Sequence, residues 1–218
     1  RTAPIFSDTG VWRWWVVLAG VTTMLLGGWR ALRETDAKLV LAHSTVSQLG
    51  LLTVLFGIGS PYATYAGVAH LVAHAIFKAG LFLGVGVIDH ELGTRDVSKI
   101  GAARRAVPVS VVAIGACLLS MAGIIPLFGF ATKEKALVAL LDADFGLVGS
   151  IALWGVIAGS VLSVAYSVRL LHALVRTPDS SDAHDAHHET SFIMRSTLAA
   201  PVVVAAIVSL GFGFAAST

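Results

Sequence analysis

A stretch of thirty-nine residues between Lys38 and Lys78 contains no Asp, Glu, Lys or Arg. Three more segments are equally free of these residues, namely 106–132, 145–168 and 196–218. A helix needs about 20 mainly apolar residues to cross the hydrocarbon core of a bilayer, so these runs are long enough to span a membrane. The chain is therefore predicted to be an all-α, polytopic membrane protein.

The composition excludes several other classes of protein. Hydrophobic residues make up 56% of the chain and charged residues only 13%, against about 25% charged residues in ordinary globular domains. This balance argues against a secreted disulfide scaffold, a nucleic-acid-binding protein and a water-soluble catalytic domain. The net charge of +2 is too small to indicate a polyanionic partner. Cys117 is the single cysteine, so a disulfide or a cysteine metal site within the chain is ruled out.

Charged and Gly/Pro-rich positions divide the apolar runs into about six membrane helices. The expected ranges are 11–32, 37–58, 63–89, 107–140, 146–175 and 195–216. The fourth range is too long for one simple span, and it contains Pro126. Proline removes a backbone donor and clashes with the preceding turn, so we expect a helix that is broken at Pro126.

The basic residues predict an orientation. Ten of the fifteen Lys and Arg residues fall in one set of alternate loops or helix ends: Arg30, Arg33, Lys38, Arg95, Lys99, Arg104, Arg105, Arg169, Arg176 and Arg195. The opposite set holds Arg1, Arg13, Lys133 and Lys135. Because cytoplasmic loops of membrane proteins carry an excess of Lys and Arg, the first set is expected in the cytoplasm and the start of the chain outside.

Two other segments carry expectations of their own. The chain starts at Arg1 and its first ten residues do not resemble a signal peptide, so we expect a piece of a longer protein. The polar segment 177–191 has almost nothing to bury and is expected to be a mobile cytoplasmic loop. It contains three histidines that suit either a metal site or a solvated linker, namely His184, His187 and His188. No fixed scaffold surrounds them, which favours the linker, and no metal site is expected.

Polar residues inside the third expected helix are the main functional candidates. His70, His74 and Lys78 follow one another at four-residue steps and so lie on one helix face. An ionisable group at mid-membrane costs at least about 2.5 to 3.5 kcal/mol on insertion scales, so such groups need a reason to be there. Two imidazoles and an amine in a row are typical of a proton relay. The alternative is that the histidines satisfy neighbouring polar groups and that Lys78 pairs with a carboxylate from another helix.

The neighbouring helices supply further candidates. In the second expected helix, Ser44, Ser47 and Gln48 share one face, which suits either a water file or interhelical hydrogen bonds without transport. Beyond the break, Lys133 is the better candidate and Glu134 its neighbour or counter-ion, because transporters place ion sites at broken helices. The alternative for Lys133 is an ordinary basic loop at the outer surface.

Three motifs resemble one known family. Residues 35–50 (TDAKLVLAHSTVSQLG), residues 70–83 (HLVAHAIFKAGLFL) and residues 126–134 (PLFGFATKE) are similar to the antiporter-like subunits shared by Mrp-type Na+/H+ antiporters and respiratory complex I. The resemblance covers nearly the whole chain. Within the family, residues 93–96 (GTRD) and 165–169 (AYSVR) look most like the large A-type Mrp subunit.

The resemblance implies a fold of about fourteen or more helices built from two inverted five-helix repeats, of which this chain would hold the second repeat and one further helix. It also implies a proton or ion relay of His70, His74, Lys78 and Lys133. Supporting residues would be Glu134, Lys38, His43, Ser44, Ser47 and Gln48. The sequence departs from the family pattern in two places, since His43 replaces a usual aromatic residue and Ile125-Pro126 replaces a frequent proline pair.

The function implied is that of a membrane subunit of a multi-subunit Na+ (or other monovalent cation)/proton antiporter in the plasma (inner) membrane of a prokaryote. Its partners would be the other membrane subunits, the lipid bilayer, protons and the cation, with no nucleic acid and no cofactor. The alternative is a proton-translocating subunit of NADH:quinone oxidoreductase, in which redox chemistry elsewhere drives the same relay. A third interpretation, an inert assembly subunit, predicts that the relay residues can be replaced freely.

Overall fold

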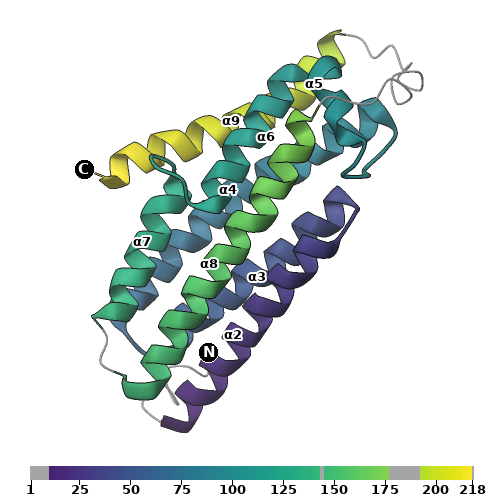
Figure 1. The fold of residues 1–218 in the computed structure, drawn as a ribbon. Coiled ribbons are helices and arrows are strands. Elements are labelled where there is room, and N and C mark those ends of the chain that lie inside the picture. Colours follow the sequence, from purple (N-terminus) through teal and green to yellow (C-terminus); the bar gives the residue numbers. More distant parts are fainter. Residues whose placement is uncertain (1–9, 143–144, 177–191, 218) are drawn as a thin grey trace.

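The computed structural model describes residues 10–142, 145–176 and 192–217, and this part of the chain is all-helical (Figure 1). Its elements are α2 (Gly10–Arg33), α3 (Ala37–Gly57), α4 (Pro61–Leu92), the short 3-10 turn η1 (Ile100–Ala102), α5 (Ala103–Ala106), α6 (Pro108–Ala122), α7 (Phe128–Leu141), α8 (Gly146–Val175) and α9 (Phe192–Ser217). The segment 177–191, with His184, His187 and His188, lies outside the described residues, as does Arg1.

Four of these helices are long and apolar enough to cross a membrane, namely α2, α3, α4 and α8. Shorter apolar helices cover 108–122 and 199–215. The helix expected over 63–89 extends over Pro61–Leu92. The range 107–140 holds two helices, α6 and α7, with residues 123–127 between them. The chain is thus a polytopic membrane protein.

Local sequence signals explain where the central helices begin. The Asp36 side chain precedes α3 and accepts hydrogen bonds from the backbone N–H groups of Lys38, at 2.7 Å, and Leu39, at 3.3 Å. Ser60 caps α4 in the same way by accepting from the N–H of Ala63 at 3.3 Å. Pro61 occupies the first position of α4, where its missing N–H costs nothing.

Helix α4 lies at the centre of the bundle and contacts α3, α6, α7 and α9. Its buried apolar side chains include Phe77, Leu81 and Ile88, which pack with Ile114 and Leu118 of α6. In Figure 1, α9 runs along the side of the bundle that α4, α6 and α7 form. This packing buries one face of the middle of α4, whereas Leu71 and Val72 on another face stay exposed, at 44% and 46%.

Helices α2 and α3 approach each other closely because small residues line their contact. A Cβ atom added at Gly50 of α3 would lie 2.5 Å from the backbone nitrogen of Met24 in α2. Small residues let helix backbones come together in membranes, where no hydrophobic force favours association. Helices α2 and α3 therefore pack closely against each other on one side of the bundle.

The interruption between α6 and α7 has its own set of hydrogen bonds. Gly123 ends α6 in the left-handed conformation (φ +87°), and its N–H is within reach of the carbonyl oxygens of Leu119 and Ser120. On the other side of the break, the N–H of Gly129 donates to the Ser120 hydroxyl at 3.2 Å. Protein groups thus satisfy backbone N–H groups on both sides of the break, where lipid offers no acceptor.

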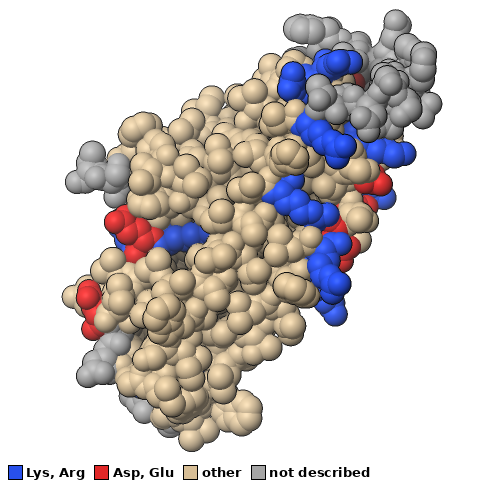
Figure 2. Space-filling model, in the orientation of Figure 1, with Lys and Arg blue, Asp and Glu red and all other residues tan. Residues whose placement is uncertain are grey.

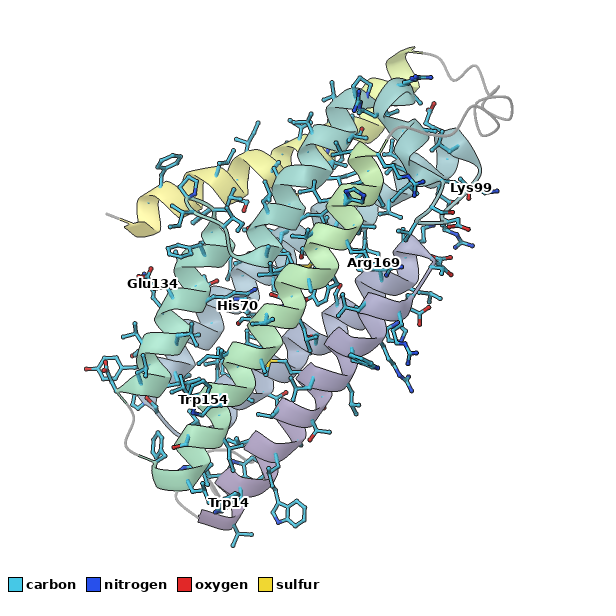
Figure 3. The ribbon with its side chains drawn as sticks, in the orientation of Figure 1. Trp14, His70, Lys99, Glu134, Trp154 and Arg169 are labelled. Atoms are coloured by element: carbon cyan, nitrogen blue, oxygen red, sulfur yellow. The ribbon has the colours of Figure 1, made fainter. Side chains whose placement is uncertain are left out.

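Charged residues gather toward one end of the bundle. Figure 2 shows Lys and Arg concentrated at that end of the visible face, while most of the remaining surface is neither acidic nor basic. Lys99 lies near this end, and Trp14 lies near the opposite end (Figure 3). Trp14 is partly exposed, at 37%. Aromatic rings of this kind favour the headgroup level of a bilayer.

Candidate functional site

The three polar residues of α4 are buried within the bundle. His70, His74 and Lys78 are 0%, 7% and 5% exposed, and His70 lies between the helices in Figure 3. Their four-residue steps keep them on the face of α4 that turns toward α3 and α7. Three titratable groups thus occupy one continuous strip of the interior.

Lys78 is held by groups of α3. Its ammonium nitrogen donates to the carbonyl oxygen of Leu41 at 3.0 Å and to the Ser44 hydroxyl at 2.5 Å. Ser44 in turn donates to the same Leu41 carbonyl at 2.9 Å. Among the described residues, the ion pairs involve other side chains, and none joins Lys78 to a carboxylate. The acceptors that the Lys78 side chain contacts among these residues are therefore uncharged.

His74 lies between the other two members of the row and is poorly satisfied. Its Nδ1 atom is buried and has no hydrogen-bond partner in the part of the chain that the structure describes. The ring meets Phe77 edge-on, with centroids 5.4 Å apart. A buried nitrogen of this kind is costly unless a water molecule forms a hydrogen bond with it.

His70 has partners on two other helices. Its Nε2 lies 2.9 Å from the side-chain oxygen of Gln48 in α3, and its Nδ1 lies 2.9 Å from the Thr132 hydroxyl in α7. Gln48 also donates to the Tyr166 hydroxyl of α8 at 3.0 Å. The hydrogen bonds of His70 and Gln48 therefore connect four helices, α3, α4, α7 and α8.

Sequence reasoning missed two members of this cluster. Thr132 immediately precedes Lys133, and Tyr166 is the one tyrosine of the apolar run 145–168. Both are buried, at 1% exposure. The available signals were that Thr132 stands next to the candidate Lys133 and that Tyr166 lies in a run without charged residues. Only the packing of helices distant in the sequence shows that Thr132 contacts His70 and that Tyr166 contacts its partner Gln48.

Lys133 occupies the break between α6 and α7. Its ammonium group donates to the carbonyl oxygens of Met121, at 2.7 Å, and Ala122, at 3.3 Å, and to the Ser163 hydroxyl of α8, at 2.6 Å. Both carbonyls belong to the last turn of α6, where backbone acceptors lack helical partners and the helix dipole is negative. The side chain is 7% exposed, so it lies inside the bundle and not in a surface loop.

The remaining candidates lie outside this interior cluster. Glu134 points away from the bundle (Figure 3) and lines an open surface pocket of about 560 Å³ together with Tyr62, Tyr65 and Lys135. It thus faces away from Lys133, although the two are neighbours in sequence. Ser47 donates to the carbonyl of Met24 at 2.9 Å and joins α3 to α2.

Lys38 and His43 belong to the charged end of the bundle. Lys38 forms an ion pair with Asp89 at 2.7 Å, and His43 lies 3.5 Å from the carboxylate of Glu34. In the adjoining loop, a hydrogen bond from the Ser98 hydroxyl, aided by the Ser98 N–H, holds the pKa of Asp96 below its usual value. These contacts bind the α2–α3 connection to the end of α4. In the described ranges, no group of three His, Cys, Asp or Glu residues has the arrangement of a metal site.

Comparisons with known proteins agree with one another. The family model described as "NADH:quinone oxidoreductase/Mrp antiporter, TM" matches residues 1–163. The A/B-type subunit of a probable K(+)/H(+) antiporter of Rhizobium meliloti is 38% identical over 96% of this chain and 21% of its own length. The A-type subunit of a Na(+)/H(+) antiporter of Bacillus subtilis is 37% identical over 81% of this chain and 24% of its own length.

Two solved structures of membrane complexes contain chains similar to this one. A chain of the Mrp complex from Dietzia sp. DQ12-45-1b has a TM-score of 0.77 and 34% identity, over 93% of this chain and 21% of that chain. A chain of the membrane-bound sulfane sulfur reductase, an archaeal respiratory membrane complex, has a TM-score of 0.78 and 27% identity, over 92% and 32%. The chain therefore spans about a fifth to a quarter of the two curated relatives named above.

Proposed function

The chain belongs to the membrane family shared by NADH:quinone oxidoreductases and Mrp antiporters, and from this premise we propose that it forms part of the A-type subunit of a multi-subunit cation/proton antiporter. In this role it exchanges Na+ or another monovalent cation for protons and acts as a transporter, not an enzyme. Its partners are the other membrane subunits of the complex.

The observation that carries the proposal is the buried row of His70, His74 and Lys78, which a hydrogen bond through Thr132 links to the segment of α7 that holds Lys133. Keeping four ionisable groups at membrane depth is expensive, and their neighbours here are hydroxyls, an amide and backbone carbonyls. Such partners tolerate both protonation states of each group. A relay needs this tolerance, because every member must gain and lose a proton in each cycle.

Each relay residue has a specific part in this proposal. Lys78 exchanges protons on the α3 side, where Ser44 accepts from its ammonium. His74 and His70 carry the proton along α4. Lys133 receives it at the break, where the carbonyl end of α6 stabilises the positive charge. The membrane potential contributes about 2.3 kcal/mol per charge per 100 mV to the driving force.

The finer architecture is also part of the proposal. Helices α2, α3, α4, α8 and α9 would each be one membrane span, and α6 and α7 would be the halves of a sixth, broken helix. They would form one of two inverted five-helix repeats plus a further helix. The basic end faces the cytoplasm and the Trp14 end faces outside, because ten basic residues share one set of loops. The segment 177–191 would be a cytoplasmic loop.

The similarity to a chain of an archaeal respiratory complex favours one second candidate, a proton-translocating subunit that redox chemistry in other subunits drives. Purification of the intact complex tests both functions. The antiporter requires recovery with cofactor-free membrane subunits, and Na+ or K+ added to everted vesicles should dissipate a preformed pH gradient. Recovery with NADH-oxidising, iron–sulfur-bearing subunits, and proton pumping that depends on them, would overturn the antiporter function.

A further inference from the structure

The hydrogen bonds around His70 have a definite direction, which the Gln48 side chain sets. The Tyr166 hydroxyl of α8 accepts from the Gln48 amide nitrogen at 3.0 Å. The amide oxygen of Gln48 is thereby the atom that faces His70.

This direction determines which nitrogen of His70 carries hydrogen. An amide oxygen has no hydrogen to give, so Nε2 of His70 must donate to it, in the neutral ring as well as in the charged ring. The neutral ring is therefore the Nε2–H tautomer, and its Nδ1 has a free lone pair. Nδ1 is the only atom of His70 that can gain or lose a proton without breaking the hydrogen bond to Gln48.

The group that faces Nδ1 is the Thr132 hydroxyl, and it has two acceptors within reach. One is Nδ1 of His70 at 2.9 Å, and the other is the carbonyl oxygen of Gly129 at 3.2 Å. A hydroxyl has one hydrogen and serves one of them at a time. With neutral His70 it donates to Nδ1. With protonated His70 the new Nδ1–H donates to the Thr132 oxygen, and the hydroxyl hydrogen turns to Gly129.

We propose that Thr132 is a positioning residue of the relay: its hydroxyl reverses direction each time His70 gains or loses a proton, and it confines that exchange to Nδ1. The Nδ1–H bond of His70 forms as an N–H bond of His74 or Lys133 breaks, and it breaks again as the proton moves to the other of these two groups. The Thr132 hydroxyl keeps its own hydrogen throughout. Protons consequently enter and leave His70 on the α7 side, next to the turn that carries Lys133, and do not pass through the ring toward Gln48.

The surroundings of His70 leave Thr132 as its one hydroxyl partner on this side. The charged or titratable groups that act on the His70 ring are His74 on its own helix and Lys133 on α7. Tyr166 of α8 is linked to the ring only through Gln48. Helix α3 contributes the uncharged Gln48. Of the described groups, Thr132 is the one that contacts Nδ1 directly and can accept or donate there.

The variant Thr132→Val tests this role, because valine has nearly the same shape and no hydroxyl. In everted vesicles with the intact complex, cation-dependent proton flux should fall by about tenfold, the factor expected for one lost hydrogen bond to a charged group. Thr132→Ser should restore flux to within about twofold of the parent, since it restores the hydroxyl. Thr53→Val is the matched control, because Thr53 donates only to the backbone oxygen of Leu49 on an exposed face.

Nitrogen-15 NMR of the histidine-labelled intact complex gives an independent measurement, with His70 assigned from the spectrum of His70→Gln. Neutral His70 should be the Nε2–H tautomer. A neutral Nδ1–H tautomer, or parental flux in Thr132→Val, would overturn the proposal. If Thr132→Val does not assemble, the tautomer of the parent decides alone.

This inference rests on the proposed transport function, but the two can fail separately. A parent complex without cation-dependent flux rejects the transport function, and it leaves the tautomer of His70 as the measurement that judges the hydrogen-bond chain.

Discussion

The ammonium nitrogen of Lys133 lies 2.7 Å from the carbonyl oxygen of Met121, so a side chain of α7 satisfies a backbone acceptor at the end of α6. The same nitrogen reaches the Ala122 carbonyl and the Ser163 hydroxyl. The lysine therefore connects the two halves of the interruption to α8. Its charge also stands where the dipole of α6 favours a cation.

Replacing this lysine should weaken the fold as well as transport. Lys133→Met keeps the length of the side chain but leaves two carbonyls and a hydroxyl without their donor. Each unsatisfied buried group costs about 1–3 kcal/mol, so the midpoint temperature of unfolding of the purified complex should fall. Lys135→Met on the same helix is the control, since Lys135 is exposed and should tolerate the change. An unchanged midpoint in Lys133→Met would show that the carbonyls find other partners.

Lys78 should be indispensable for transport and dispensable for assembly. Lys78→Ala removes the only ammonium beside Ser44 in the described α3–α4 contact, so cation-dependent flux in everted vesicles should collapse. Lys78→Arg should fail as well, because a guanidinium group does not release its proton near neutral pH. Lys99→Ala, in an exposed turn, should transport like the parent. Normal flux in either Lys78 variant at normal expression would remove Lys78 from the relay.

The spacing of residues predicted part of this site, and helix packing supplied the rest. Four-residue steps place His70, His74 and Lys78 on one face whatever the neighbouring helices do. Which side chains of other helices meet that face depends on packing angles, and sequence spacing carries no information on these. Thr132 and Tyr166 were missed for this reason.

The same geometry explains the position of Glu134. Consecutive residues on a helix point about 100° apart, so residues 133 and 134 face different surroundings. Lys133 is buried in the break, whereas Glu134 lines a surface pocket. Sequence adjacency suggested a counter-ion, and the helix turn separates the two side chains.

The contact between α2 and α3 should depend on the absence of a side chain at Gly50. In Gly50→Val the Cβ atom would lie within 2.5 Å of the Met24 backbone. Forcing the helices apart should cost about 1–3 kcal/mol and lower the unfolding midpoint. Gly86→Ala is the matched control, since a Cβ atom there meets nothing within 4 Å. It should be neutral or stabilising by up to about 1 kcal/mol, the difference in helix propensity. Equal midpoints for both variants would contradict the close approach.

The loop after α4 should respond to acid through Asp96. Its hydrogen bonds from Ser98 hold the pKa of Asp96 below the usual 3.8. A depressed pKa means that the ionised carboxylate contributes stability above about pH 4, and that this contribution is lost as the pH falls through the lowered value. Amide hydrogen exchange at Ser98 should therefore accelerate in acid. Ser98→Ala should bring the pKa of Asp96 back toward 3.8, and an unchanged NMR titration of Asp96 would contradict this.

His74 should set the pH dependence of transport. Its Nδ1 is buried without a hydrogen-bond partner among the described residues, so a water molecule is the partner open to it. Imidazole alternates between neutral and charged forms near neutral pH, whereas the amide of His74→Gln keeps hydrogen bonding and cannot titrate. The variant should therefore lower the maximal cation-dependent flux and flatten its profile between about pH 5 and 8. His90→Gln is the matched control, because His90 lies exposed in the last turn of the same helix and should change neither quantity. If His74→Gln keeps the parental rate and pH optimum, His74 only fills space beside Phe77, and protons must pass from Lys78 to His70 through water alone.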